Sequence, residues 1–202
     1  MSSLKFPKAA VLALILTLIL AACVDKTGLT EKSAKVPAGN PNAAVVVTEY
    51  GDFQCPACGA AYPKIVKPLL AKYGTQIRYD FRQFPLQTLH EYALESAMAS
   101  ECAADQGKFW EFVDKDYMNQ KDLSSEELRT WADELKVDTA LFDRCIKSKI
   151  KKDTVLAEYE EGRTLGVQGT PTFFVNGKKV DNTLEAISAE IEAATKGVMQ
   201  RL

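Results

Sequence analysis

Histidine is nearly absent from this chain of 202 residues, in which His90 stands alone. A Ser-His-Asp triad or a histidine-rich metal centre therefore has little to be built from. The chain also lacks an excess of one charge, because 25 basic residues face 27 acidic ones. This balance argues against nucleic acid as a partner, since phosphate binding needs a concentrated basic surface. No apolar run reaches the length of about 18 residues that is typical of a membrane-spanning helix.

The composition is that of a folded globular protein, with 47% hydrophobic and 26% charged residues. The length suggests one domain, or one domain with an insertion.

The N-terminus has the features of a signal peptide, which we assign to residues 1–22. Lys5 and Lys8 precede Ala9–Ala22, a run that is apolar except for one threonine and is too short to span a bilayer comfortably. The run leads into the letters LAAC, which resemble the lipoprotein box of bacteria. That resemblance implies that Cys23 is lipidated and becomes the first residue of the mature protein. The alternative is an ordinary secretory signal that is cleaved nearby, with Cys23 incidental.

Residues 24–42 are polar and rich in Lys, Thr, Ser, Gly and Pro, so we expect a flexible tether without a core of its own. The folded part is expected to begin near Ala43 and to continue to the C-terminus at 202. An exported chain meets an oxidising compartment, where disulfides persist. Four cysteines remain beyond the tether, and their spacing does not choose among the three possible pairings.

The pattern of apolar residues predicts the order strand, helix, strand, a helical insertion, two strands and a helix. Pro63 and Pro68 should kink the first helix, and Asn176-Gly177 is a strong hairpin signal. The expected segments are strands at 43–53, 77–84, 172–175 and 178–180, a helix from Cys55 to Gly74, helices over about 88–165, and a closing helix from Leu184.

The sequence Cys55-Pro56-Ala57-Cys58 follows the first strand and opens a helix. A helix N-terminus presents unpaired N–H groups and the positive end of the helix dipole, which stabilise a thiolate. We therefore assign Cys55 as the nucleophile and Cys58 as the resolving thiol of a redox pair. The alternatives are a structural disulfide or half of a metal site.

Two segments together resemble the DsbA-like branch of the thioredoxin superfamily: EYGDFQCPAC at 49–58 and GTPTFFVNG at 169–177. The resemblance covers about residues 43–196 and includes the helical insertion. It implies an α/β thioredoxin fold, βαβ followed by ββα, with an α-helical insertion at about 88–165.

The resemblance also implies roles for single residues. Pro171 matches a cis-proline beside the disulfide, and Thr170 would pair its backbone with an extended substrate. Glu49 matches a buried acid that relays a proton to or from Cys58. The alternatives are an ordinary loop proline and a solvated strand carboxylate. Some relatives carry a second disulfide in the insertion, which here would join Cys102 and Cys145; the alternative is two buried thiols.

Other residues have simpler interpretations. His90 is interpreted as a packing or capping residue, and Phe109, Trp110, Val113 and Tyr117 as helix residues of the core. Glu158, Glu160 and Glu161 are expected on a solvated helix face. Ala57 stands where strongly oxidising members of the family carry histidine, so the direction of electron flow remains open.

The sequence therefore predicts a lipid-anchored thiol-disulfide oxidoreductase of the bacterial envelope, in the periplasm or on the outer face of the membrane, without a cofactor or a metal. Its expected partners are exported proteins with cysteines and a membrane redox partner. We favour oxidation of substrates by a monomer. A reductase or isomerase of the same fold is the first alternative, and a thiol-based metal carrier or binding module is the second.

Overall fold

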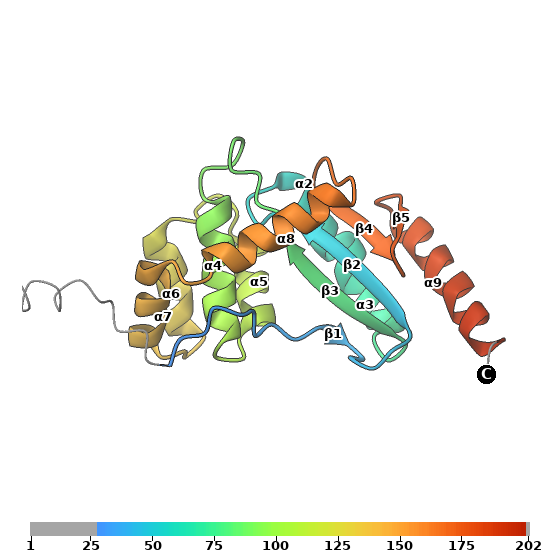
Figure 1. The fold of residues 1–202 in the computed structure, drawn as a ribbon, viewed down its shortest axis with the longest axis horizontal. Coiled ribbons are helices and arrows are strands. Elements are labelled where there is room, and N and C mark those ends of the chain that lie inside the picture. Colours follow the sequence, from blue (N-terminus) through green and yellow to red (C-terminus); the bar gives the residue numbers. More distant parts are fainter. Residues whose placement is uncertain (1–27, 201–202) are drawn as a thin grey trace, which may run out of the picture.

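A computed structural model describes residues 28–200, so the expected signal peptide and Cys23 lie outside the described residues. Five strands form one sheet in the order β1-β3-β2-β4-β5 (Figure 1). β2 and β3 are parallel, and the other neighbouring pairs are antiparallel. The strands are β1 (Ala38–Gly39), β2 (Val45–Gly51), β3 (Ile77–Gln83), β4 (Thr172–Val175) and β5 (Lys178–Val180).

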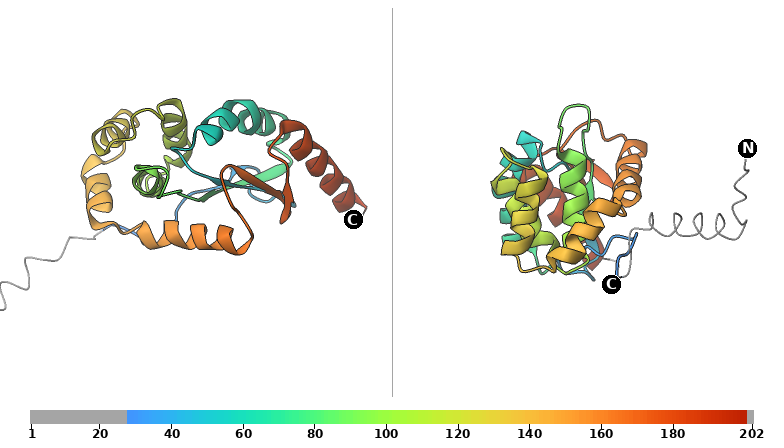
Figure 2. Two further views of the ribbon diagram at one scale, coloured as in Figure 1. Left: turned by 90° about the horizontal axis from the view of Figure 1, so that it is seen from above. Right: turned by 90° about the vertical axis from the view of Figure 1, so that its left-hand side faces the viewer.

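Helices cover both faces of this sheet (Figure 2). Five of them lie between β3 and β4 and form the insertion, so the α/β order agrees with the predicted thioredoxin fold. The helices are α2 (Pro56–Ala61), the π-helix η2 (Tyr62–Val66), α3 (Lys67–Tyr73), α4 (Ala93–Ala104), α5 (Phe109–Met118), α6 (Ser125–Glu134), α7 (Thr139–Ser148), α8 (Lys152–Thr164) and α9 (Leu184–Met199). No helix among residues 28–200 is long and apolar enough to cross a membrane.

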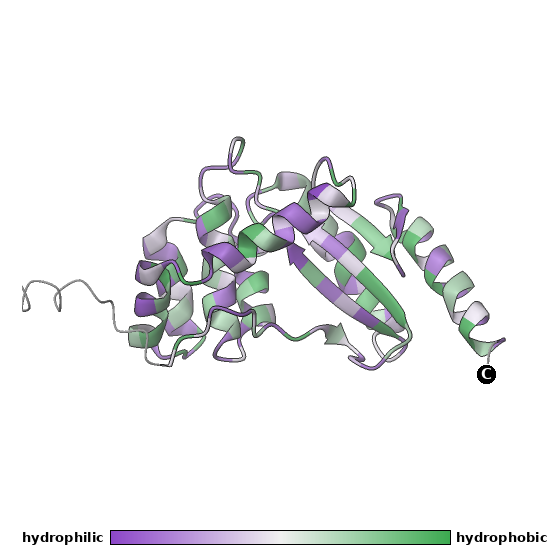
Figure 3. Cartoon of the chain, viewed as in Figure 1, coloured by the Kyte–Doolittle hydropathy of each residue, from purple (hydrophilic) through white to green (hydrophobic). Residues whose placement is uncertain are grey.

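The two faces of β2 enter two different cores. Val45 and Val47 pack with η2, α3 and α9, whereas Tyr50 packs with Phe84 and Phe174 on the face covered by α8. Side chains alternate along a strand, so Glu49 shares the face of Val45 and Val47. Figure 3 shows the change along β2 from apolar residues at its start to polar residues near its end.

The helical insertion has its own apolar core, formed by residues of α4 to α7 such as Phe112, Trp131 and Phe142. Within this core Cys102 of α4 and Cys145 of α7 form a disulfide, with 5.9 Å between their Cα atoms. This disulfide therefore belongs to a different core from Cys55 and Cys58.

The helix after Cys55 is interrupted by one π turn, where the sequence predicted a kink or two short helices. Pro63 has no N–H to offer the carbonyl one turn before it, and the chain widens until Lys67 donates to the carbonyl of Tyr62. Pro68 follows in the first turn of α3, and Gly74 ends the helix as expected. The π turn therefore separates the cysteine-bearing turn from the helix that packs on the sheet.

The flexible tether expected at 24–42 is wrong for the part that the structure describes. Lys35 lies with its ammonium 2.6 Å from Glu101 and 2.6 Å from Glu158, and all three side chains are largely buried. The indole N–H of Trp110 donates to the carbonyl of Val36, at 2.9 Å. We call residues 31–39, which include β1, the N-terminal strap. The folded domain therefore begins before Ala43.

We predicted a solvated helix face for Glu158, Glu160 and Glu161, and this prediction is wrong for Glu158. Glu158 is 7% exposed and accepts from Lys35, Arg82 and the backbone N–H of Gln83. A helix turns by about 100° per residue, so neighbours in a run of acids point in different directions. Glu160 and Glu161 are exposed, as predicted.

Candidate active site

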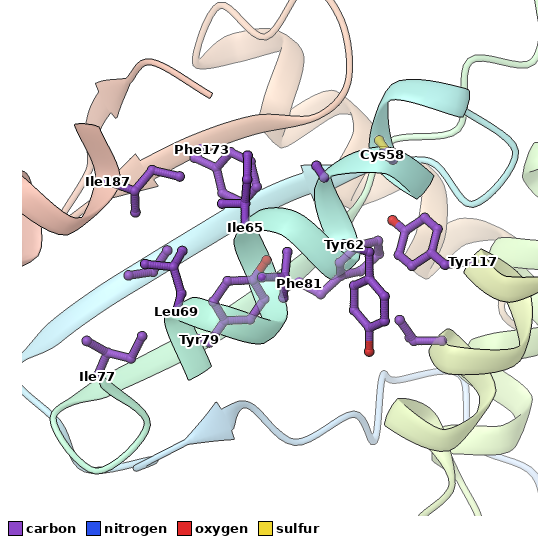
Figure 4. Close-up of a cluster of buried hydrophobic side chains, with 14 of the residues drawn as sticks. Cys58, Tyr62, Ile65, Leu69, Ile77, Tyr79, Phe81, Tyr117, Phe173 and Ile187 are labelled. Carbon is purple, nitrogen blue, oxygen red and sulfur yellow. The ribbon is translucent and has the colours of Figure 1, made fainter. Parts of the chain in front are cut away.

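Cys55 and Cys58 lie where β2 ends and α2 begins. Figure 4 shows Cys58 in the turn of α2. Cys55 is the N-cap residue of α2, with extended backbone angles, and is 7% exposed. Cys58 lies one turn further into the helix, and its side chain is completely buried. Both side chains are free thiols in this structure.

The two thiols have opposite electrostatic environments. A hydrogen bond from the Cys58 thiol lowers the pKa of Cys55 to about 5, helped by Thr170 and the N–H groups of Cys58 and Ala57, against the effect of burial. Burial raises the pKa of Cys58 well above 9.0, and the charges of Cys55 and Glu49 act in the same direction. At neutral pH the pair therefore contains one thiolate and one thiol.

The loop before β4 covers the sulfur of Cys55. The Thr170–Pro171 peptide bond is cis, as the family resemblance implied. The Cys55 thiol lies 3.3 Å from the carbonyl oxygen of Thr170, and the Asn182 side chain donates to the carbonyl of Pro171, at 2.5 Å. A pocket of about 370 Å³ opens beside this loop, lined by Gln168–Thr172 and Lys179–Asn182.

Glu49 is buried, 1% exposed, so the alternative of a solvated strand carboxylate is wrong. Its Oε2 accepts from the hydroxyl of Tyr79, and its Oε1 has no partner in the protein. Burial raises the pKa of this carboxyl group to about 7; the Tyr79 hydrogen bond lowers it and the charge of Cys55 raises it. A group with this pKa is suited to taking and returning a proton near neutral pH.

Sequence reasoning missed the role of Asp52, which organises the loop before α2. Its carboxylate accepts from the backbone N–H groups of Gln54 and Leu86, both at 2.8 Å. Oδ2 of Asp52, the atom that accepts from Leu86, is also 2.8 Å from Nδ1 of His90. His90 thus ties two loops together, in keeping with its interpretation as a packing or capping residue.

Gln120 was also missed, and it reaches the site from the loop between α5 and α6. Its side-chain N–H₂ donates to the carbonyl of Phe53 at 2.7 Å and to that of Cys55 at 2.8 Å. No local pattern could have identified it, because 65 residues separate it from Cys55.

As for metals, residues 28–200 contain no cluster of three His, Cys, Asp or Glu side chains that could ligate one ion.

The comparison with protein families agrees with this geometry. A family model described as Thioredoxin matches residues 31–193. The thiol-disulfide exchange protein alpha-DsbA2 of Wolbachia pipientis has a similar structure, with a TM-score of 0.69 and 24% identity over 78% of this chain and 86% of that one. BdbD of Bacillus subtilis gives a TM-score of 0.71 and 23% identity over 81% and 94%. The predicted fold is therefore confirmed.

The curated relatives carry a different name. The Na(+)/H(+) antiporter NhaA 1 of Salinispora arenicola is 40% identical over 166 residues, which are 81% of this chain and 25% of the antiporter. NhaA 3 of Salinispora tropica is 38% identical over 158 residues, 77% of this chain and 24% of that protein. The chain thus spans about a quarter of the length of these relatives, whose name describes much larger proteins.

Proposed function

Because the chain belongs to the thioredoxin family and has the fold of DsbA-type thiol-disulfide oxidoreductases, we propose that it exchanges disulfides with cysteine-containing exported proteins through Cys55 and Cys58. The observation that carries this proposal is the division of roles between the two thiols. The outer one is a thiolate at neutral pH, and the inner one is a buried thiol one helical turn away.

The chemistry has two sulfur transfers. In the oxidising direction, a substrate thiolate attacks Sγ of Cys55 in the protein disulfide, and Cys58 leaves and takes up a proton. A second substrate thiolate then attacks the substrate sulfur of the mixed disulfide, which releases Cys55 as a thiolate and oxidises the substrate. In the reducing direction Cys55 attacks a substrate disulfide, and Cys58 loses its proton and resolves the mixed disulfide.

We favour the oxidising direction, because a thiolate that is stabilised in the reduced protein makes its disulfide a stronger oxidant. Ala57 adds no positive charge, yet hydrogen bonds from the Cys58 thiol and the backbone, with a contribution from Thr170, lower the pKa of Cys55 to about 5. The reduction potential tests this direction. A value of about −120 mV supports an oxidase, and a value of about −270 mV supports a reductase.

Purified protein also tests the two alternative functions, a metal carrier and an isomerase. We expect purified protein without stoichiometric metal whose Cys55 reacts with an alkylating reagent at pH 5 to 6. Stoichiometric copper or zinc together with a sluggish thiol would favour the metal-carrier interpretation. Turnover of scrambled disulfides without net oxidation would favour an isomerase.

We further propose that the protein is exported and held at the outer face of a bacterial membrane by lipid on Cys23. The letters LAAC after an apolar run support this location, as does the oxidising chemistry, which requires a compartment where disulfides persist. Labelling with a radioactive fatty acid tests the anchor. We expect label in the wild type and none in Cys23→Ser, with the variant released from membranes.

The partners follow from this location. We propose exported proteins with cysteines as substrates and a membrane redox protein that reoxidises Cys55 and Cys58. Each would form a mixed disulfide with Cys55, which a Cys58→Ser variant would trap for identification.

A further inference from the structure

The side-chain amide of Gln120 lies against the backbone of the turn that leads into α2. Its nitrogen is 2.7 Å from the carbonyl oxygen of Phe53 and 2.8 Å from that of Cys55. Both of these backbone oxygens can only accept, so the N–H₂ end of the amide must face them. One side chain from the helical insertion therefore donates to two carbonyl groups of the segment that carries the nucleophile.

The direction of the Cys55 carbonyl determines how the sulfur faces α2. Cys55 is the N-cap residue, with φ −69° and ψ 120°. The ring of Pro56 fixes its own φ, so the ψ of Cys55 is the torsion that orients the cysteine relative to the helix. Pro56 also has no N–H, and the backbone donors that stabilise the Cys55 sulfur are the N–H groups of Cys58 and Ala57. A turned carbonyl would move the sulfur away from these donors.

The helix holds this carbonyl from one side and Gln120 holds it from another. The N–H of Gly59 donates to the Cys55 carbonyl at 3.1 Å, which is the first hydrogen bond of α2. A carbonyl oxygen has two lone pairs, so it can accept from Gln120 as well. The carbonyl of Phe53 lies two residues earlier, and the same amide therefore also fixes the chain that enters the N-cap.

Gly59 makes room for the amide. A Cβ at this position would lie 1.9 Å from Oε1, 2.5 Å from Cδ and 2.8 Å from Nε2 of Gln120. Any side chain at position 59 would therefore displace the amide from the two carbonyl groups. Glycine destabilises a helix interior relative to alanine, and it is the residue that permits a close approach.

We propose that Gln120 is a positioning residue for Cys55: its amide, admitted by Gly59, holds the N-cap so that the N–H groups of α2 face the sulfur, and it thereby makes the Cys55–Cys58 disulfide a stronger oxidant. The proposal rests on the thiol-disulfide exchange proposed above and adds a contribution from the helical insertion. Gln120 acts through the backbone of Cys55 and takes no part in the sulfur transfers.

The effect on the disulfide follows from the thiolate. The Cys58 thiol makes the largest contribution to the lowered pKa of Cys55, and the N–H groups of Cys58 and Ala57 add to it. Donors that turn away from the sulfur stabilise the thiolate less, so the pKa of Cys55 rises. A less stable thiolate makes the reduced protein less stable relative to the disulfide, which becomes a weaker oxidant.

The test removes the same contact from its two sides. Gln120→Met keeps the length of the side chain and removes its donors, whereas Gly59→Ala keeps the amide and displaces it. In both variants we expect the pKa of Cys55, measured from the rate of alkylation over pH, to rise by at least about half a unit. The equilibrium constant for oxidation of glutathione by the protein should then fall at least about threefold, which is a reduction potential about 15 mV more negative.

Two comparisons distinguish positioning from a general loosening of the loop. Asn119→Ala is the matched control, because the neighbouring amide of Asn119 donates to the carbonyl of Lys115 at 2.9 Å, and it should leave the pKa and the potential unchanged. The double variant Gly59→Ala/Gln120→Met should shift the pKa of Cys55 as much as either single variant, because each substitution removes the same contact.

Three outcomes would overturn the proposal or the function on which it rests. An unchanged Cys55 pKa and an unchanged potential in either folded single variant would overturn the positioning role of Gln120. Additive shifts in the double variant would also overturn it, since the two substitutions would then act independently. Failure of the wild type to exchange disulfides would instead overturn the proposed function, and the alkylation measurement would still report the pKa of Cys55.

Discussion

Cys55 and Cys58 are three residues apart, yet their pKa values are shifted in opposite directions. The position of each sulfur on the helix causes the difference. Cys55 stands at the N-cap, where N–H groups and a neighbouring thiol donate to its sulfur, whereas Cys58 faces the core. The Cys58 thiol therefore stabilises the thiolate of Cys55 and itself stays protonated.

Replacement of Cys58 by Ala should raise the pKa of Cys55 from about 5 toward 9.0, because the hydrogen bond from the Cys58 thiol is the largest cause of the lowering. Cys58→Ser is the matched control, since a hydroxyl at this position still donates. The rate of alkylation over pH reports the pKa in both variants. An equally low pKa in Cys58→Ala would show that the backbone and Thr170 suffice.

The lowered pKa also makes the stability of the reduced protein depend on pH. The folded pKa of Cys55 lies below its ordinary value of 9.0, so the thiolate contributes stability above pH 9 that is lost as the pH falls through about 5. Denaturant unfolding should show the reduced form losing stability relative to the oxidised form between these values. A constant difference between the two forms would contradict the assigned shift.

The Glu49 carboxyl group makes stability depend on pH in the opposite direction. Its folded pKa of about 7 lies above 4.5, so its contribution is present below pH 4.5 and is lost as the pH rises through 7. Glu49→Gln should therefore be more stable than the wild type by about 3 kcal/mol at pH 8 and nearly equal to it at pH 4. The amide oxygen still accepts from Tyr79, which makes the variant a close match. A gain that does not depend on pH would contradict the buried, titrating carboxyl group.

At the scale of elements, the N-terminal strap is held by charges that are themselves buried. The side chains of Lys35 and Glu101 are 8% and 0% exposed, and the side chain of Glu158, which also pairs with the lysine, is 9% exposed. Lys35→Ala would leave two acids in a small buried space with Arg82 as their remaining nearby cation.

We expect Lys35→Ala to lower the free energy of unfolding by about 3 to 5 kcal/mol, the cost of leaving buried charges unpaired. Lys67→Ala is the control, because the Lys67–Asp114 pair is 51% and 44% exposed and should contribute less than about 1 kcal/mol. Urea unfolding at one pH measures both. Equal effects would mean that the strap adds little to stability.

At the scale of the whole molecule, the described residues form separate cores for the redox site and for the insertion. The sheet core carries Cys58, and the insertion core carries the Cys102–Cys145 disulfide, which closes a loop with a sequence separation of 43. Gln120 and Tyr117 reach from the insertion to the site. The insertion therefore completes the environment of the cysteines.

Replacement of both Cys102 and Cys145 by Ala should lower the free energy of unfolding by about 4 kcal/mol, as expected for a loop of this length. The reduction potential of the Cys55–Cys58 pair should stay unchanged, because the second disulfide is buried in a different core. Thiol-disulfide equilibration with glutathione and chemical unfolding measure the two quantities separately. A shifted potential would show that the insertion tunes the site through its rigidity.

The sequence by itself determined the features that depend on near neighbours. Alternation at 77–84 predicted β3, and Asn176-Gly177 predicted the turn in which both residues have positive φ. Cys55 and Cys58 at a helix start indicated the chemistry in the same way, because a helix N-terminus acts over a few residues.

Only the tertiary structure decided the groups that meet across long separations. Lys35 meets Glu158 over 123 residues, Gln120 meets Cys55 over 65, and Tyr117 lies over Gly51. Such contacts produce no periodic pattern in the sequence, since each depends on the folded path of the whole chain. The burial of Glu49, and with it the pKa that suits it to proton transfer, was likewise decided by the packing of η2, α3 and α9 on its face of β2.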